Sequence, residues 1–89
     1  MPLKPSCLIV GAGDGVGSAI ARAFAREGLA VCITRRPRNL EALESVATAI
    51  RADGGEAHAF GVDARNEAEM IALVDRIEAD IGPLQVVVF

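Results

Sequence analysis

The stretch VGAGDGVG, residues 10–17, places four glycines and one acidic residue between an apolar run and an amphipathic segment. Residues 7–10 have the length and composition of a buried strand. After the loop, apolar residues recur with the spacing of one helical face, namely Val16, Ala19, Ile20, Ala23 and Phe24, and Gly28 favours the turn that ends a helix. A glycine-rich loop between a strand and a helix N-terminus presents free backbone N–H groups, so this stretch predicts an anion-binding loop.

The same alternation of apolar runs and amphipathic segments continues along the chain. We expect further strands over residues 30–34, 56–60 and 84–89, the second of them an outer strand. The helices between them are predicted to run from an N-cap at Asn39 to Gly54 and from an N-cap at Asn66 to Gly82. Alternating strands and helices predict an α/β fold with a parallel sheet and right-handed crossovers. With the glycine loop after the first strand, the prediction becomes part of a Rossmann-type doubly wound sheet with strand order 3-2-1-4.

Composition and charge exclude several classes of function. The 89 residues have a net charge of −3, no Tyr or Trp, and no basic cluster beyond Arg35, Arg36 and Arg38, so no nucleic-acid partner is expected. No stretch approaches the ~18 apolar residues of a membrane span, and the first residues do not have the pattern of a signal peptide. Cys7 and Cys32 lie inside apolar runs and are predicted to be buried free thiols, with no metal site, which favours a cytoplasmic location.

The loop is compatible with only some nucleotide-binding designs. A P-loop needs a Lys-Ser/Thr pair after its last glycine, and the only lysine of this chain is Lys4. The common dinucleotide motif needs a glycine at its sixth position, which is Val16 here. Residues 11–15 also resemble the first motif of S-adenosylmethionine methyltransferases, but Ile9 and Arg35 stand where those enzymes usually carry acidic residues. The methyltransferase alternative is therefore the weakest of those considered.

The spacing that fits is Gly11, three residues, Gly15, one residue, Gly17. This loop resembles that of the short-chain dehydrogenase/reductase family, with Val10 in place of the usual Thr. The resemblance covers roughly residues 6–89 and the cofactor-binding front portion of a typical family member. It implies that a nicotinamide dinucleotide contacts the loop residues Gly11, Gly13, Asp14, Gly15, Val16 and Gly17.

Two further segments resemble the cofactor site of the family. The segment from Phe60 to Ala64 resembles one in which an Asp bonds the adenine amino group, which implies this role for Asp63 and an adenine-lining role for Ala64. Arg35 and Arg36 follow the second strand, beside the expected adenosine ribose, where NAD-binding proteins carry a carboxylate. Two guanidinium groups favour the 2′-phosphate of NADP over NAD. Asp14 opposes this preference unless it caps the following helix or pairs with an Arg.

No catalytic residue can be assigned from the sequence. The family uses a Ser, a Tyr and a Lys, whereas this sequence has no Tyr, and Lys4 precedes the first strand. We therefore expect residues 1–89 to be the N-terminal part of a dinucleotide-binding domain and to be inactive alone. The resemblance implies that the intact protein is a homo-oligomeric oxidoreductase transferring hydride between NADP(H) and a carbonyl or alcohol substrate. The alternative is a non-catalytic dinucleotide-binding or interaction module.

Overall fold

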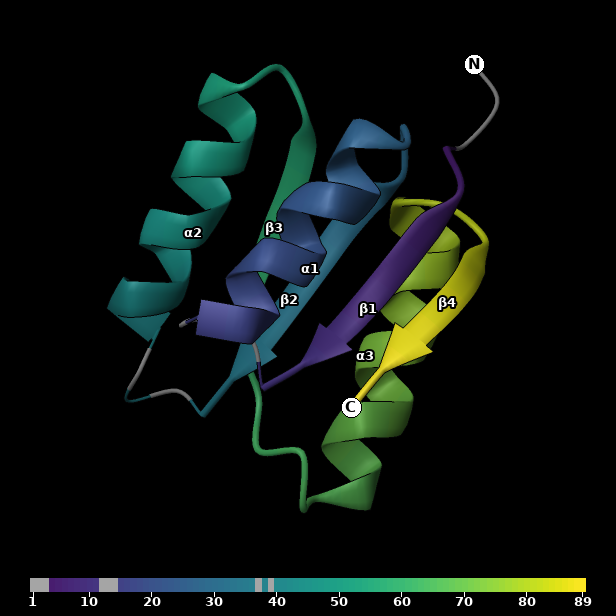
Figure 1. Ribbon diagram of the computed structural model, residues 1–89. Helices are drawn as coiled ribbons and strands as arrows, with labels where there is room; N and C mark the ends of the chain where they lie inside the picture. The colour runs from purple at the N-terminus through teal and green to yellow at the C-terminus, as the bar shows by residue number, and fades with distance from the viewer. Residues whose placement is uncertain (1–3, 12–14, 37, 39) are drawn as a thin grey trace.

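The computed structural model of the chain describes residues 4–11, 15–36, 38 and 40–89, and it contains strands and helices in strict alternation (Figure 1). The elements are β1 (Ser6–Val10), α1 (Gly15–Arg26), β2 (Ala30–Arg35), α2 (Leu40–Ala52), β3 (Glu56–Gly61), α3 (Glu67–Asp80) and β4 (Leu84–Val88). The four strands pair in parallel in the order β3-β2-β1-β4. The predicted α/β fold and strand order are therefore confirmed.

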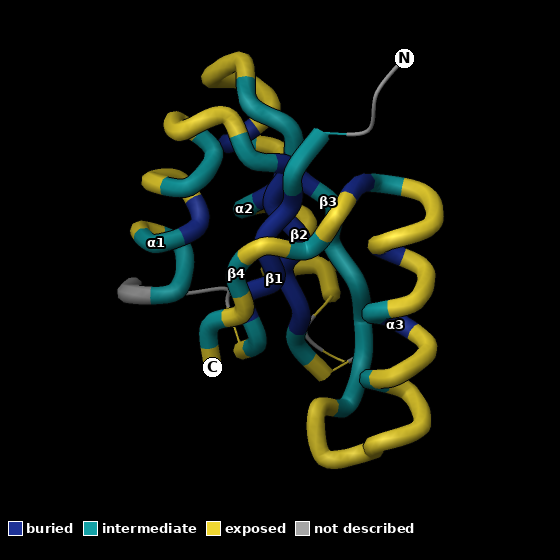
Figure 2. Tube along the Cα trace, turned by 90° about the vertical axis from the view of Figure 1, so that its right-hand side faces the viewer, coloured by how far each residue is buried: buried dark blue, intermediate teal, exposed yellow. Residues whose placement is uncertain are grey.

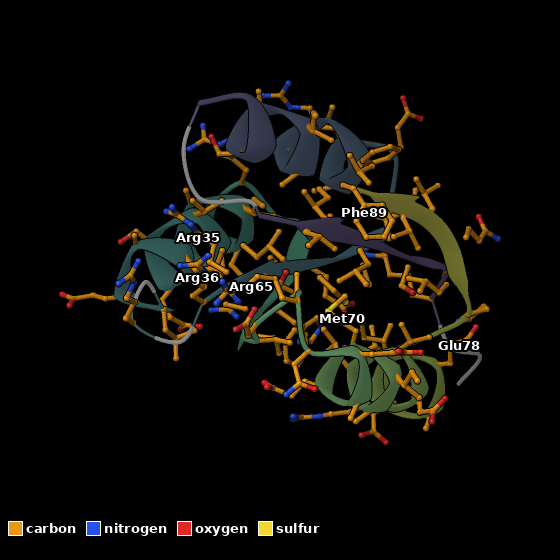
Figure 3. The ribbon with its side chains drawn as sticks, turned by 90° about the horizontal axis from the view of Figure 1, so that it is seen from below. Arg35, Arg36, Arg65, Met70, Glu78 and Phe89 are labelled. Carbon is orange, nitrogen blue, oxygen red and sulfur yellow. The ribbon has the colours of Figure 1, made fainter. Side chains whose placement is uncertain are left out.

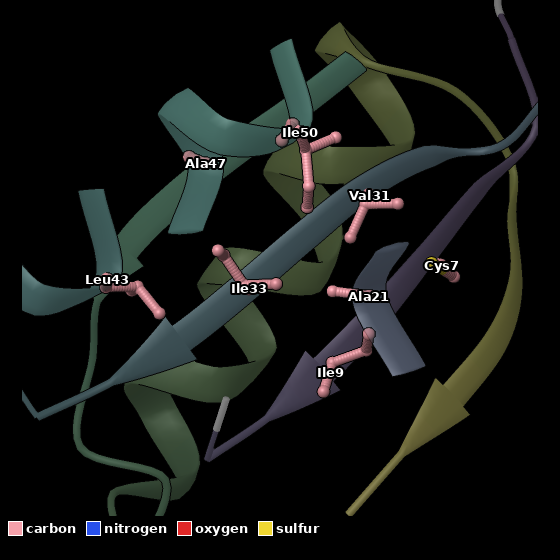
Figure 4. Packing of buried hydrophobic residues seen from close by; sticks show 9 residues of the cluster. Cys7, Ile9, Ala21, Val31, Ile33, Leu43, Ala47 and Ile50 are labelled. Atoms are coloured by element: carbon pink, nitrogen blue, oxygen red, sulfur yellow. The ribbon is translucent and has the colours of Figure 1, made fainter. Parts of the chain in front are cut away.

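The helices cover both faces of the sheet, α1 and α2 on one and α3 on the other (Figure 1). Successive residues of a strand point to opposite faces, so β1 and β2 supply apolar side chains to two separate cores. On one face, Ile9 and Ile33 pack with residues of α1 and α2 (Figure 4). On the other face, Leu8 and Cys32 pack against Leu73 and Ile77 of α3. Figure 2 shows the resulting buried centre along β1 and β2.

The buried face of α1 differs from the one predicted. Ala19 and Ala23 are exposed, whereas Ala21 is fully buried against the sheet and Phe24 and Ala25 pack at its side. The prediction was right for Ile20 and Phe24, which pack against the core, and wrong for Ala19 and Ala23. Alanine fits either a buried or an exposed helical position, so the apolar spacing alone did not fix the rotation of the helix.

The helix ends follow the predicted chemistry in part. The Asn66 side chain caps α3 by accepting a hydrogen bond from the Glu69 N–H at 3.1 Å, as predicted. Gly28 and Gly54 have φ angles of 92° and 90°, the left-handed conformation expected at these two turns. Gly82 differs, because its φ is not in the left-handed region and it is instead packed against the Lys4 carbonyl oxygen. The predicted N-cap Asn39 lies outside the described residues.

Both cysteines are free and buried, as predicted, and they point to opposite faces of the sheet. Burial raises the pKa of the Cys7 thiol to about 11 and that of the Cys32 thiol to about 12. Within the part of the chain that the structure describes, no helix is long and apolar enough to span a membrane.

Candidate cofactor site

The candidate site lies where β1, β2 and β3 end, beside the start of α1. The carboxyl ends of parallel strands are the usual ligand site of such sheets, because the connections leave a crevice there. Gly11 follows β1 directly with a φ of 85°, and its N–H donates to the Thr34 carbonyl oxygen at 2.9 Å. The Val62 N–H likewise donates to the Arg35 carbonyl oxygen at 2.8 Å. These two bonds hold the chain segments that leave β1 and β3 against the end of β2.

A solvent-open hollow of about 380 Å³ lies between these segments. Four of its lining residues are arginines, and Figure 3 shows three of them, Arg35, Arg36 and Arg65, together at this end of the molecule. Among the described residues, the lining consists of Val10, Gly11, Thr34, Arg35, Arg36, Arg38, Val62, Ala64 and Arg65. Guanidinium groups are permanently charged and bind phosphates through paired hydrogen bonds, so the hollow has the chemistry of an anion site.

Thr34 lines the same hollow and also carries a buried hydroxyl group. The residue is 1% exposed, and none of the described residues gives its Oγ1 a hydrogen-bond partner. Buried hydroxyl groups in proteins nearly always have such a partner.

Asp63 and Arg65 form a tight pair in the turn after β3. The carboxylate accepts hydrogen bonds from the Arg65 backbone N–H at 2.9 Å, from its Nε at 3.1 Å and from its Nη2 at 3.0 Å. Through these bonds Arg65 lowers the pKa of Asp63 to about 2, and the positive charge of Arg36 acts in the same direction. Asp63 is thus a fixed carboxylate at the edge of an otherwise cationic hollow.

A family profile described as short chain dehydrogenase matches residues 6–89. The chain belongs to this family. The match covers the glycine loop, the arginines after β2 and the Asp63 turn together, and it overturns the methyltransferase alternative.

Individual proteins of known sequence or structure agree with this match. A 2,3-dihydro-2,3-dihydroxybenzoate dehydrogenase of Bacillus subtilis is 36% identical over 80 residues, which are 90% of this chain and 30% of that protein. A metagenomic short-chain oxidoreductase solved with NADP superimposes with a TM-score of 0.85 at 30% identity, covering 98% of this chain and 38% of that one. A Haemophilus influenza oxidoreductase solved with NAD gives a TM-score of 0.82 at 25% identity, covering 98% and 30%. The chain therefore spans about a third of the length of these proteins.

The structure brings together several of the residues that were predicted to bind a cofactor. Gly11, Arg35, Arg36 and Ala64 line the hollow, and Asp63 is bonded to its Arg65 wall. Gly15 and Gly17 lie in the first turn of α1 with Val16 between them. Gly13 and Asp14 lie outside the described residues.

Sequence reasoning missed five lining residues of the hollow, the apolar Val10 and Val62 and the polar Thr34, Arg38 and Arg65. Arg38 could have been found, because it belongs to the same basic cluster as Arg35 and Arg36. The spacing of Asp63 and Arg65 is a weak signal for the turn in which an Asp side chain accepts from the backbone two residues on. No signal in the sequence distinguishes Thr34 from an ordinary strand residue.

Proposed function

We propose that the hollow binds the adenosine half of NADP and that the chain is the cofactor-binding portion of an oxidoreductase. The observation that carries the proposal is the charge at the end of β2, where Arg35, Arg36 and Arg38 line the hollow and no carboxylate follows the strand. A 2′-phosphate carries close to two negative charges at neutral pH and pairs well with a guanidinium group. A carboxylate at this place would bond the two ribose hydroxyls of NAD instead.

The other residues fit the rest of the nucleotide. We assign the adenine to Asp63 and Ala64, and the pyrophosphate to the loop and helix start formed by Gly11, Gly13, Asp14, Gly15, Val16 and Gly17. At this end of α1 the backbone N–H groups and the helix dipole favour a negative charge. When bound, the nicotinamide ring supplies or accepts the hydride. The substrate class that we propose is a small carbonyl or alcohol compound, with no catalytic residue assigned here.

We also propose a cellular location and an oligomeric state for the intact protein. Two buried free thiols suit a reducing compartment, which favours the cytoplasm. We also propose a homo-oligomer for the intact protein, on the family resemblance. No nucleic-acid or membrane partner is proposed.

Fluorescence titration of the intact protein with NADPH and NADH tests the proposed cofactor. We expect NADPH to bind more tightly, and Arg36→Ala to weaken NADPH binding by about tenfold or more, because a hydrogen bond to a charged group contributes about 1.5–3 kcal/mol. NADH affinity should change little. Arg26→Ala is the matched control, since it removes an exposed arginine where α1 ends, away from the hollow. Tighter NADH binding, or unchanged NADPH affinity in Arg36→Ala, would overturn the NADP assignment.

A further inference from the structure

The pair of Asp63 and Arg65 has a geometry that leaves the carboxylate one free acceptor position. A carboxylate offers about four acceptor positions, two on each oxygen. Oδ1 accepts two hydrogen bonds, from the backbone N–H and the Nε of Arg65, and Oδ2 accepts one, from Nη2. Among the described residues, none donates to the remaining position, which lies on Oδ2. The planar guanidinium fixes the plane of the carboxylate, which decides the direction in which that position points.

The same pair lies within the electrostatic reach of the arginines after β2. Arg36 contributes to the lowered pKa of Asp63, so the carboxylate and this guanidinium interact. The Asp63 side chain is 31% exposed and that of Arg65 is 72% exposed, while Arg65 also lines the hollow with Arg35, Arg36 and Arg38. Without Arg65, an uncompensated negative charge would stand beside the arginines and would oppose a second negative group placed there.

We propose that Arg65 is a positioning residue that sets the preference for a 2′-phosphorylated nucleotide by holding and neutralising Asp63. The guanidinium keeps the Asp63 carboxylate from repelling the phosphate. It also keeps one Oδ2 position free to accept an N–H from the adenine. The inference rests on the proposed function, since it needs the adenosine half of the cofactor in this hollow.

The competing interpretation is that the pair only stabilises a surface turn. Exposed ion pairs contribute little to stability, so this interpretation predicts no selective effect on ligands. The two are separated by comparing two probes that differ only in one phosphate, 2′,5′-ADP and 5′-AMP, by calorimetry on the intact protein. Variants Arg65→Gln, Arg65→Lys and the double variant Asp63→Asn/Arg65→Gln are compared with the wild type. Circular dichroism verifies that each variant is folded, and Arg26→Gln controls for loss of one distant positive charge.

We expect Arg65→Gln to weaken 2′,5′-ADP binding by about tenfold, which corresponds to about 1.4 kcal/mol, and to weaken 5′-AMP binding much less. The double variant should recover part of the loss for 2′,5′-ADP, because the uncompensated carboxylate is gone. Arg65→Lys should keep most of the preference for 2′,5′-ADP, since the lysine retains the positive charge but not the planar fork.

The outcomes distinguish failure of the inference from failure of the proposed function. An equal effect of Arg65→Gln on both probes, or no recovery in the double variant, would overturn the role of Arg65 while wild-type preference for 2′,5′-ADP still supports the proposed cofactor. A wild-type protein that binds neither probe would overturn both.

Discussion

At the scale of single residues, Asp63 shows how one neighbour fixes the charge state of a carboxylate beside the candidate site. Its pKa is about 2, against an ordinary value of 3.8, because Arg65 donates hydrogen bonds to the charged form. A carboxylate whose pKa is lowered by folding stabilises the folded state above pH 3.8, and that stabilisation is lost as the pH falls towards 2. Asp63 is therefore fully ionised throughout the neutral range in which a cofactor would bind.

The substitution Arg65→Gln should raise the pKa of Asp63 towards its ordinary value. The side-chain hydrogen bonds of Arg65 are the largest cause of the lowered pKa, and Arg36 would remain as a weaker influence. Carboxyl-carbon chemical shifts followed by NMR between pH 1.5 and 6 would report the midpoint directly. An unchanged midpoint in Arg65→Gln would show that another group holds the charge of Asp63.

Residues of the candidate site could be predicted where they lie at or just after the end of a strand, because the strand order then decides which residues are neighbours. Arg35 is the last residue of β2, and Arg36 and Ala64 come after strand ends. Parallel strands bring their carboxyl ends to one edge of the sheet, so the sequence could place these residues together. Arg65 and Thr34 could not be found in the same way. Arg65 matters because its side chain bonds to Asp63 across a turn, and Thr34 matters because of the face of β2 on which it lies. The spacing of residues in the sequence predicts neither feature.

At the scale of elements, strands and helices were predictable where the residue types were distinctive. Buried parallel strands appear as short Val/Ile/Leu runs, and β1, β2 and β4 follow that pattern. The rotation of α1 was not predictable, because its alanines fit several faces equally well. The role of Gly82 was also hidden, since the close approach of Lys4 comes from a segment 78 residues earlier in the chain.

The turn between α3 and β4 is held by the residues that precede and begin β1. The Ser6 hydroxyl is fully buried and donates to the carbonyl oxygens of Gly82 and Pro83 at 3.1 and 3.2 Å. The Ser6 N–H also donates to the Pro83 carbonyl oxygen at 2.9 Å. Gly82 is thus enclosed by backbone, which cannot move aside as a flexible side chain could.

The substitution Gly82→Ala should destabilise the fold by about 1–3 kcal/mol or more, the usual cost of overpacking a well-packed site. A Cβ at this position would collide with the Lys4 carbonyl oxygen. The free energy of unfolding in urea is the measurement, and Gly82→Asn should cost at least as much because it is larger. At Gly28 we expect the opposite order, with Asn costing less stability than Ala. A Cβ there meets nothing within 4 Å, and the only obstacle is the left-handed φ of 92°, a conformation that Asn tolerates. Equal stability of Gly82→Ala and the wild type would contradict the close approach.

At the scale of the whole molecule, the sheet divides the apolar interior into two unequal cores. The core under α1 and α2 joins residues from three strands and both helices, whereas the core under α3 has few fully buried members. The candidate site lies at the carboxyl ends of β1 and β2, the strands that separate the two cores. Ile9 and Ile33 point into one core, whereas Leu8 and Thr34, at the alternate strand positions, point to the other face of the sheet. Because β1 and β2 are packed on both faces, they determine where Gly11 and Arg35 lie.

The larger core should dominate the stability of the chain, and α2 offers a matched pair of leucines to test this. Leu43 is 0% exposed in the core, whereas Leu40, three residues earlier on the same helix, is 37% exposed. Leu43→Ala should lower the free energy of unfolding by about 2–5 kcal/mol, because it removes buried apolar contacts and leaves a cavity. Leu40→Ala should cost clearly less in the same denaturation experiment, since Leu40 keeps part of its contact with water in the folded state. Similar losses of unfolding free energy for both variants would contradict the greater contribution of Leu43 to the core.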